Sequence, residues 1–119
     1  MKLKYIGPTV SLSLTNNKIY DCISVEDSLV RIIDDEELIN FDYEELKKAI
    51  DNNDISYGYL YSIIKPKPSG SLEYGIWEIV EDSKEKILEK TIDKYIKMYN
   101  SKGNDFEKFK MDILSKYNR

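Results

Sequence analysis

The sequence contains no histidine and only one cysteine, Cys22, among its 119 residues. Without histidine, the commonest general base and the commonest metal ligand are both missing, and no Ser–His or Cys–His nucleophile pair can form. A single cysteine excludes an intramolecular disulfide and a zinc site built from several thiolates. We therefore predict no catalytic triad, no metal site and no cofactor, and we expect Cys22 to be a small core residue.

Long apolar runs are also missing, and proline and glycine together number only eight. The apolar stretches span a few residues each, too few for a membrane span, and Met1 to Lys4 do not begin a signal peptide. Hydrophobic residues nevertheless make up 41% of the chain, which is enough for a folded core. These features favour a folded protein of the reducing cytoplasm, without membrane attachment.

Charge divides the chain into two segments. Residues 1–82 carry 16 acidic and 8 basic residues, whereas residues 83–119 carry 6 acidic and 10 basic residues. Such asymmetry is typical of segments with different surfaces. We expect a β domain over 1–82 and a helical tail over 83–119 that packs on the acidic body.

The first 80 residues are mainly short strands separated by turns. Alternation of polar and apolar residues, with many β-branched and aromatic side chains, predicts strands over 2–6, 9–14, 18–25, 29–33, 38–41, 55–64 and 73–80. Asp42 and Glu45 form a capping-box pattern, which predicts a short helix with Tyr43, Leu46 and Ile50 on one face.

The tail reads as two amphipathic helices. Asp82 and Ser83 are predicted to cap the first, whose apolar stripe runs to Tyr99, and Asn104 to cap the second, whose stripe begins at Phe106. Two such helices joined by a short loop form a helical hairpin. Their apolar faces must pack on each other, on the sheet or on another subunit, and the last option predicts a homodimer through these helices.

Several short motifs follow one another in a fixed order. They are Lys4–Gly7, Leu14–Tyr20, Arg31–Asp35, Gly58–Tyr61 and Gly75–Asp82. In this order they resemble small SH3-like barrel proteins that are common in phages, prophages and mobile elements of bacteria. The resemblance implies a small antiparallel SH3-like β-barrel or sheet. The chain departs from the family in two places, with a helical insert at about 36–57 and a C-terminal two-helix hairpin, so we expect an α+β fold that carries both additions. The family offers no established activity or catalytic residues to transfer.

An acidic cluster is the first candidate site. It comprises Asp34, Asp35, Glu36 and Glu37, followed by Asp42, Glu44 and Glu45. These carboxylates could bind a cation, or imitate nucleic-acid phosphates in a basic groove of a partner. They lack the spacing and the glycine of a calcium loop. The alternative is a solvated turn and a helix N-terminus.

Aromatic residues form the second candidate site: Tyr57, Tyr59, Tyr61, Tyr74 and Trp77. An aromatic groove in SH3-like barrels commonly binds peptides, and the alternative is cross-strand packing. Only Lys65 and Lys67 interleave with these rings, so direct nucleic-acid binding is not expected. The tail lysines Lys86, Lys90 and Lys94 share a ridge, but acidic neighbours favour a solvated face.

Function follows from these patterns as a hypothesis. We expect a non-enzymatic interaction protein of a phage or mobile element, which inhibits a host defence system by binding a protein or a signalling nucleotide. One alternative is an immunity protein that neutralises a toxin nuclease through its acidic surface. Another is a small carboxylate-dependent hydrolase, although no carboxylate pair has a spacing that distinguishes it.

Overall fold

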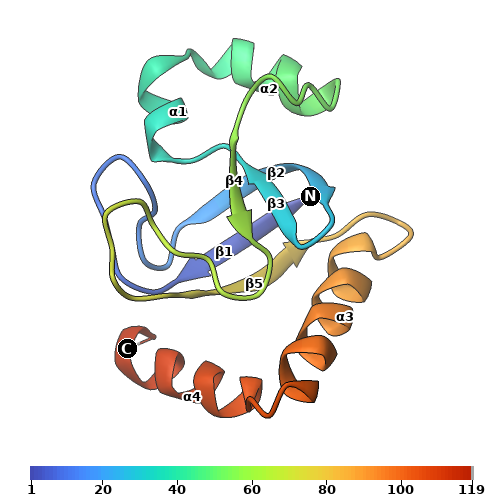
Figure 1. Ribbon diagram of the computed structural model, residues 1–119. Coiled ribbons are helices and arrows are strands. Elements are labelled where there is room, and N and C mark those ends of the chain that lie inside the picture. Colours follow the sequence, from blue (N-terminus) through green and yellow to red (C-terminus); the bar gives the residue numbers. More distant parts are fainter. Residues whose placement is uncertain (119) are drawn as a thin grey trace.

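A five-stranded antiparallel sheet in the order β4-β3-β2-β1-β5 forms the body of the computed structural model, which describes residues 1–118 (Figure 1). The strands are β1 (Lys2–Ile6), β2 (Ile19–Glu26), β3 (Leu29–Ile32), β4 (Tyr59–Ser62) and β5 (Ile76–Glu81). Helices α1 (Asp35–Asn40) and α2 (Tyr43–Asp51) lie between β3 and β4, and α3 (Ile87–Ser101) and α4 (Phe106–Tyr117) follow β5. The predicted α+β class is confirmed.

Two of the predicted strands are wrong. Residues 9–14 form turns, and residues 38–41 belong largely to α1. The reason for the second error is a cap: the Asp34 carboxylate accepts the Glu37 N–H at 3.2 Å, and three acidic residues fill the first helical turn. This favourable N-terminus outweighs the alternating pattern that follows it.

The strand predicted over 55–64 is shorter in the structure, at Tyr59–Ser62. Asp54 accepts the Ser56 N–H and hydroxyl at 3.0 and 2.6 Å, which turns the chain. Gly58 then adopts φ +84°, a left-handed conformation that few other residues accept. The strand therefore begins only after the glycine.

Trp77 lies at the centre of the main core. Its ring makes edge contacts with Tyr5, Tyr20 and Tyr61, at centroid distances of 5.6, 6.4 and 6.3 Å. Its indole N–H donates to the Ser62 carbonyl oxygen at 3.0 Å. Trp77 belongs to β5 and Ser62 to β4, so this bond joins the two outer strands of the sheet.

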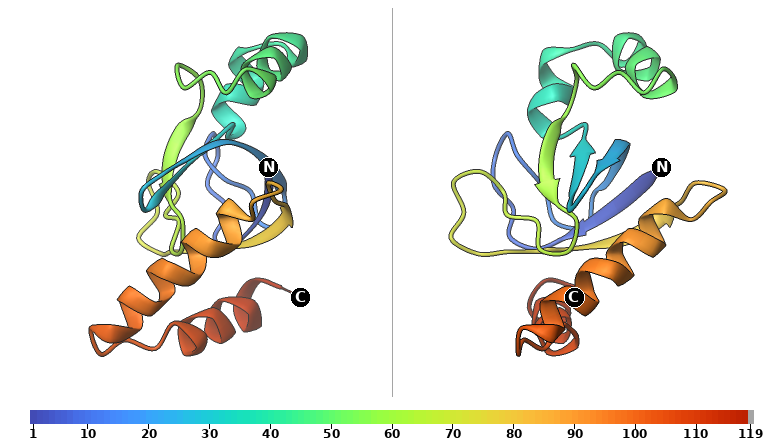
Figure 2. Two further views of the ribbon diagram at one scale, coloured as in Figure 1. Left: turned by 90° about the vertical axis from the view of Figure 1, so that its right-hand side faces the viewer. Right: turned by 45° about the vertical axis from the view of Figure 1, so that its right-hand side comes forward.

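The sheet is curved rather than flat. The register shifts between Lys2 and Leu3 in β1 and between Cys22 and Ser24 in β2, and such bulges bend strands. The curvature is visible in both views of Figure 2. Within residues 1–118, β4 and β5 share no backbone pairing, so the sheet is open and its edges meet through side chains.

The tail helices start later than the sequence predicts. Helix α3 begins at Ile87, after a turn over 83–86, yet Asp82 still accepts the N–H groups of Leu88 and Glu89 at 2.9 and 3.0 Å. The predicted cap is thus real but acts across a turn. Helix α4 is capped by Asp105 instead of Asn104, because the Asp105 side chain accepts the Lys108 N–H.

The tail packs against the sheet on the side opposite to α1 and α2 (Figures 1 and 2). Leu88 enters the main core, while Phe106 forms a second core with Ile6 and Ile76. Half-buried residues of both helices extend that second core: Ile96, Tyr99, Phe109, Ile113, Leu114 and Tyr117. The sheet is therefore one surface that covers the apolar stripes, and the homodimer stays a prediction, as does the domain boundary after residue 82.

Polar contacts also hold the end of the tail. Lys116 pairs with Glu73 at 2.8 Å, and the Tyr117 hydroxyl donates to the same carboxylate. The Asn16 amide donates to the Tyr117 carbonyl oxygen at 2.9 Å. In the part of the chain that the structure describes, no helix has the length and hydropathy needed to cross a membrane.

Candidate interaction surface

The helical insert, residues 36–57, is held on the outer face of β2 and β3. Leu46 of α2 packs with Ile23 and Ile33 in a small third core, and Ala49 is buried beside it. Leu46 and Ile50 share the packed face as predicted, but Tyr43 does not, because 73% of it is exposed. One apolar stripe thus holds α2 on the sheet, and much of the opposite face of α2 is exposed to solvent.

The acidic cluster is largely internal at its beginning. Asp34 is 3% exposed, accepts the Tyr61 hydroxyl at 2.8 Å and caps α1 through Glu37. Tyr61 in turn contacts the buried Ser13 hydroxyl at 3.0 Å. Burial raises the pKa of Asp34 above its usual value, although its hydrogen bonds act in the opposite direction.

Two further carboxylates of this cluster have internal partners. Asp35 accepts hydrogen bonds from the Thr15 and Tyr20 hydroxyls and pairs with Lys18 at 2.7 Å. Glu37 accepts the Gly58 N–H at 3.2 Å. Asp34, Asp35 and Glu37 therefore connect the insert to the sheet and are not the solvated turn of the alternative interpretation.

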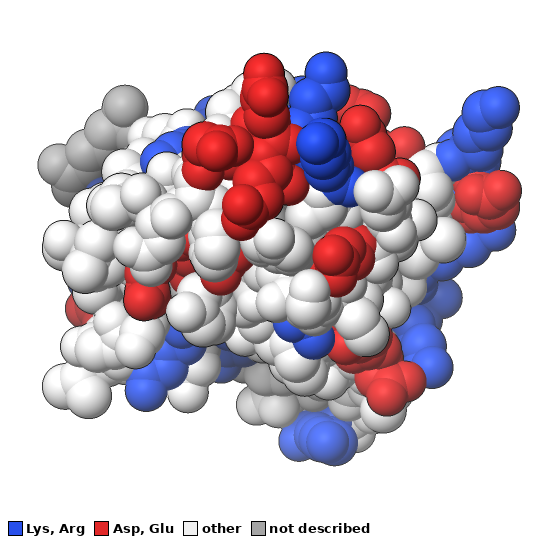
Figure 3. Space-filling model, turned by 90° about the horizontal axis from the view of Figure 1, so that it is seen from above, with Lys and Arg blue, Asp and Glu red and all other residues white. Residues whose placement is uncertain are grey.

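The charges that face outward lie further along the insert. Asp42, Glu44 and Glu45 are exposed at the start of α2, as expected for a helix N-terminus. Glu36 is half-buried, and its charge raises the pKa of Tyr59. Seen from the side of the insert, carboxylates gather beside a wide uncharged area (Figure 3).

The five aromatic candidates do not form one groove. Tyr61 and Trp77 are buried in the main core, as cross-strand packing predicts. Tyr57 lies against the Phe41 ring at 5.2 Å and donates to Glu45. Tyr59 is exposed on β4, and Tyr74 lies near the tail.

The insert exposes several large apolar side chains. Its 22 residues include five: Leu38, Ile39, Phe41, Tyr43 and Ile55. Ile39 is 69% exposed and Ile55 is 58% exposed. The same segment carries seven carboxylates against two lysines. Exposed apolar side chains that are bordered by polar residues can mark a protein-binding surface.

Sequence reasoning missed this surface because it assigned residues 38–41 to a strand. A signal was available, since Asp34 and Glu37 have the same spacing as Asp42 and Glu45. If both pairs mark the start of a helix, Leu38 and Ile39 belong to a helix that ends before Asp42. A helix this short cannot bury both side chains.

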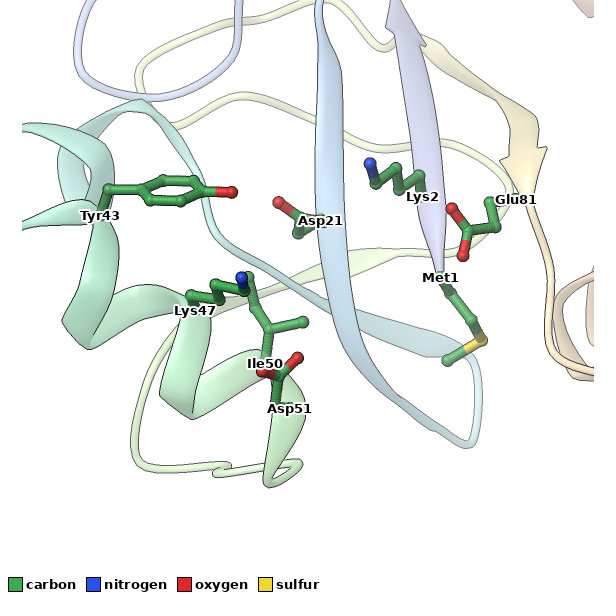
Figure 4. A pocket seen from close by; sticks show the side chains of 8 residues that line it. All are labelled: Met1, Lys2, Asp21, Tyr43, Lys47, Ile50, Asp51 and Glu81. Atoms are coloured by element: carbon green, nitrogen blue, oxygen red, sulfur yellow. The ribbon is translucent and has the colours of Figure 1, made fainter.

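A cleft of about 430 Å³ lies between α2 and the sheet, beside the packed contact of Leu46 (Figure 4). Tyr43, Lys47 and Asp51 line it from the helix, while Lys2 lies opposite Asp21 and Glu81 on the neighbouring strands. Among the described residues, none of these charged groups forms an ion pair within 4.0 Å. The cleft can therefore accept polar groups of either charge next to the apolar surface.

Other chemistry finds less support among residues 1–118. There, no three carboxylate or thiol groups converge as a metal site requires. Cys22 is buried, and burial raises its pKa to about 11, so the thiol is not activated. The prediction that Cys22 is a core residue is confirmed.

Comparisons with known proteins add no assignment. No protein-family model, curated protein or solved structure matches this chain. The surface chemistry of the helical insert is thus the feature from which function is best argued.

Proposed function

We propose that the protein is a non-enzymatic interaction protein of a phage or mobile element, and that it inhibits a host defence protein by binding through the helical insert. The observation that carries this proposal is the set of five exposed apolar side chains on a segment rich in carboxylates. A surface of this kind is costly to keep in water unless a partner covers it.

The chemistry of the insert specifies the partner. Burying an exposed Ile39 or Tyr43 side chain contributes about 1.5–3 kcal/mol each, which is the size of an interface anchor. The exposed Asp42, Glu44 and Glu45 add long-range attraction to positive charge. The partner therefore has an apolar groove bordered by lysine and arginine residues.

The mobile-element part of the proposal rests on the resemblance to SH3-like barrels. The bulges in β1 and β2 and the Trp77–Ser62 bond between the outer strands support a partly open barrel of that kind. On such a small body, a helical insert is a natural place for a function to be added.

The alternatives find less support. A toxin nuclease is also basic, so an immunity protein would use the same surface, and the identity of the captured partner separates the two. The carboxylates of the insert would repel the phosphate of a signalling nucleotide, which disfavours a nucleotide as the ligand of this surface. For a hydrolase, Asp34 and Asp35 are unsuited because both have internal partners.

The test uses three immobilised proteins in a lysate of the bacterial host: wild type, Ile39→Asp and the control Met111→Asp. Met111 lies on α4 and is 58% exposed, so the two variants add the same charge at comparable exposure on opposite sides of the sheet. We expect a defence protein to be retained by wild type and by the control and to be lost with Ile39→Asp. Equal retention by all three proteins would refute binding through the insert.

A further inference from the structure

A lysine enclosed by three aromatic rings lies at the junction of the tail and the body. The Lys65 Nζ is 4.6 Å from the ring centroid of Tyr74, 4.7 Å from that of Phe109 and 5.1 Å from that of Tyr99. Each distance is within the range of a cation–π interaction. The three rings come from the loop before β5, from α4 and from α3. We call this arrangement the Lys65 cage.

Two of the three rings, those of Tyr99 and Phe109, have packing partners other than the lysine. Phe106, which is buried, packs edge-on against Tyr99 at 6.1 Å and tilted against Phe109 at 5.9 Å. Next to Tyr74, the Gly75 N–H donates to the Pro66 carbonyl oxygen at 2.7 Å, which fixes that loop. We therefore expect Tyr99 and Phe109 to keep their positions when the cation changes, while the backbone beside Tyr74 stays fixed.

Lys65 is a poor chemical match for this cage. A primary ammonium has three donors and is strongly hydrated. Lys65 is half-buried, and among the described residues it makes one long hydrogen bond, 3.4 Å to the Tyr99 hydroxyl, so its other donors depend on solvent. No carboxylate of the described residues lies within 4.0 Å of it. A methylated ammonium keeps the charge, needs fewer hydrogen bonds and fills the space between the rings with methyl groups.

We propose that the Lys65 cage is a binding site for methylated ammonium groups, and that Lys65 occupies it until such a ligand enters. Tyr74 is 41% exposed and opens the site to solvent. The Lys65 backbone N–H is bonded to the Ser62 hydroxyl, so the side chain alone can rotate out. The site lies with the tail, on the opposite side of the sheet from the insert, and is independent of the function proposed above.

The test is an NMR titration of the full chain with tetramethylammonium chloride, comparing wild type with Lys65→Ala. Because the variant has lost the competing cation, we expect it to bind about tenfold more tightly, with shifts centred on Tyr99 and Phe109. Adding Tyr74→Ala to Lys65→Ala should abolish the binding. The control Lys94→Ala removes a lysine that contacts only one ring and should behave as wild type.

Neutral 3,3-dimethylbutanol, which has the shape of choline without its charge, should produce no shifts at the cage. Titrations with choline and with free trimethyl-lysine then distinguish two sources of the methylated ammonium group, a lipid headgroup and a modified protein. Tighter binding of either compound than of tetramethylammonium supports the site. A folded Lys65→Ala that shows no shifts overturns the proposal. If this variant does not fold, the same comparison is made between wild type and Tyr74→Ala, and shifts that are equal in both, or missing from wild type, overturn it.

Discussion

At the scale of the residue, Asp34 shows how one side chain serves two elements. One carboxylate oxygen accepts the Glu37 N–H and starts α1, and the other accepts the Tyr61 hydroxyl of β4. The carboxyl is buried, and burial raises its pKa. The charged form is therefore less favourable in the folded protein than in the unfolded chain.

This balance gives a prediction for Asp34. Above the usual aspartate pKa the folded state bears the cost of the buried charge, so wild-type stability falls as pH rises from there through the raised pKa. Asp34→Asn keeps an acceptor for Glu37 without that charge, and its free energy of unfolding should not fall over this range. Asp34→Ala loses the acceptor and should cost about 1–2 kcal/mol.

Urea unfolding of the three proteins across the acidic pH range measures these differences. If the free energies of unfolding of wild type and Asp34→Asn changed in parallel with pH, the cost assigned to the buried Asp34 charge would be wrong. An Asp34→Ala variant as stable as wild type would contradict the cap.

Residue patterns predicted some helix caps and missed others. The pair Asp42 and Glu45 was recognised, and the structure confirms the bond from the Glu45 N–H to Asp42 at 2.8 Å. The pair Asp34 and Glu37 has the same spacing but was assigned to a turn before a strand. Local sequence could not show that Tyr61, 27 positions away, would satisfy the second oxygen.

At the scale of the element, α3 depends on a residue that lies outside it. Lys86, immediately before the helix, has φ 58° and provides no side-chain cap, and Asp82 accepts three backbone N–H groups instead, those of Ser83, Leu88 and Glu89. Burial alone would raise the pKa of Asp82, but these hydrogen bonds hold it below the usual value.

The sign of that shift predicts the response of α3 to acid. The charged Asp82 stabilises the fold at pH values above the usual aspartate pKa, and this contribution disappears as pH falls through the lowered pKa. Asp82→Ala should cost about 1–2 kcal/mol at neutral pH and should speed amide exchange in the first turn of α3.

Ser83→Ala is the matched control, because Ser83 accepts only the Ile87 N–H through its side chain and its loss should cost less. Amide hydrogen exchange followed by NMR separates the two variants. Unchanged exchange at Leu88 and Glu89 in Asp82→Ala would show that the cap does not hold the helix.

Periodicity identified three of the four helices but not where they begin. The stripes predicted from Ile87 to Tyr99 and from Phe106 onward are both helical. Their first residues were misplaced because a turn separates Asp82 from α3 and because Asp105, not Asn104, caps α4. Such starts depend on the turn geometry, which single-residue preferences do not determine.

At the scale of the whole molecule, the sheet is covered by helices of two kinds. The tail buries apolar surface against Ile6 and Ile76, whereas the helical insert leaves Ile39, Tyr43 and Ile55 in solvent. The charge asymmetry of the sequence predicted a tail on an acidic body, and this packing agrees. The charge asymmetry could not predict which helices remain exposed. The position of the helical insert depends on the long-range contact of Leu46 with Ile23 and Ile33.

Deleting residues 83–119 tests the role of the tail. Removal of Leu88 opens the main core, and removal of Phe106 exposes Ile6 and Ile76, so we expect the truncated protein to aggregate or unfold. Analytical ultracentrifugation and urea unfolding provide the readout, with deletion of 118–119 as the control. A truncated protein that remains a folded monomer with an unchanged urea midpoint would contradict a structural role for the tail.

The most direct test of the proposed function is the affinity of the purified partner for wild type, Ile39→Asp and Met111→Asp, measured by calorimetry at low and high salt. We predict that Ile39→Asp weakens binding by about tenfold to a hundredfold, that Met111→Asp binds as wild type, and that salt weakens binding of both wild type and this control. Equal affinities of wild type and Ile39→Asp, or binding that is insensitive to salt, would contradict it.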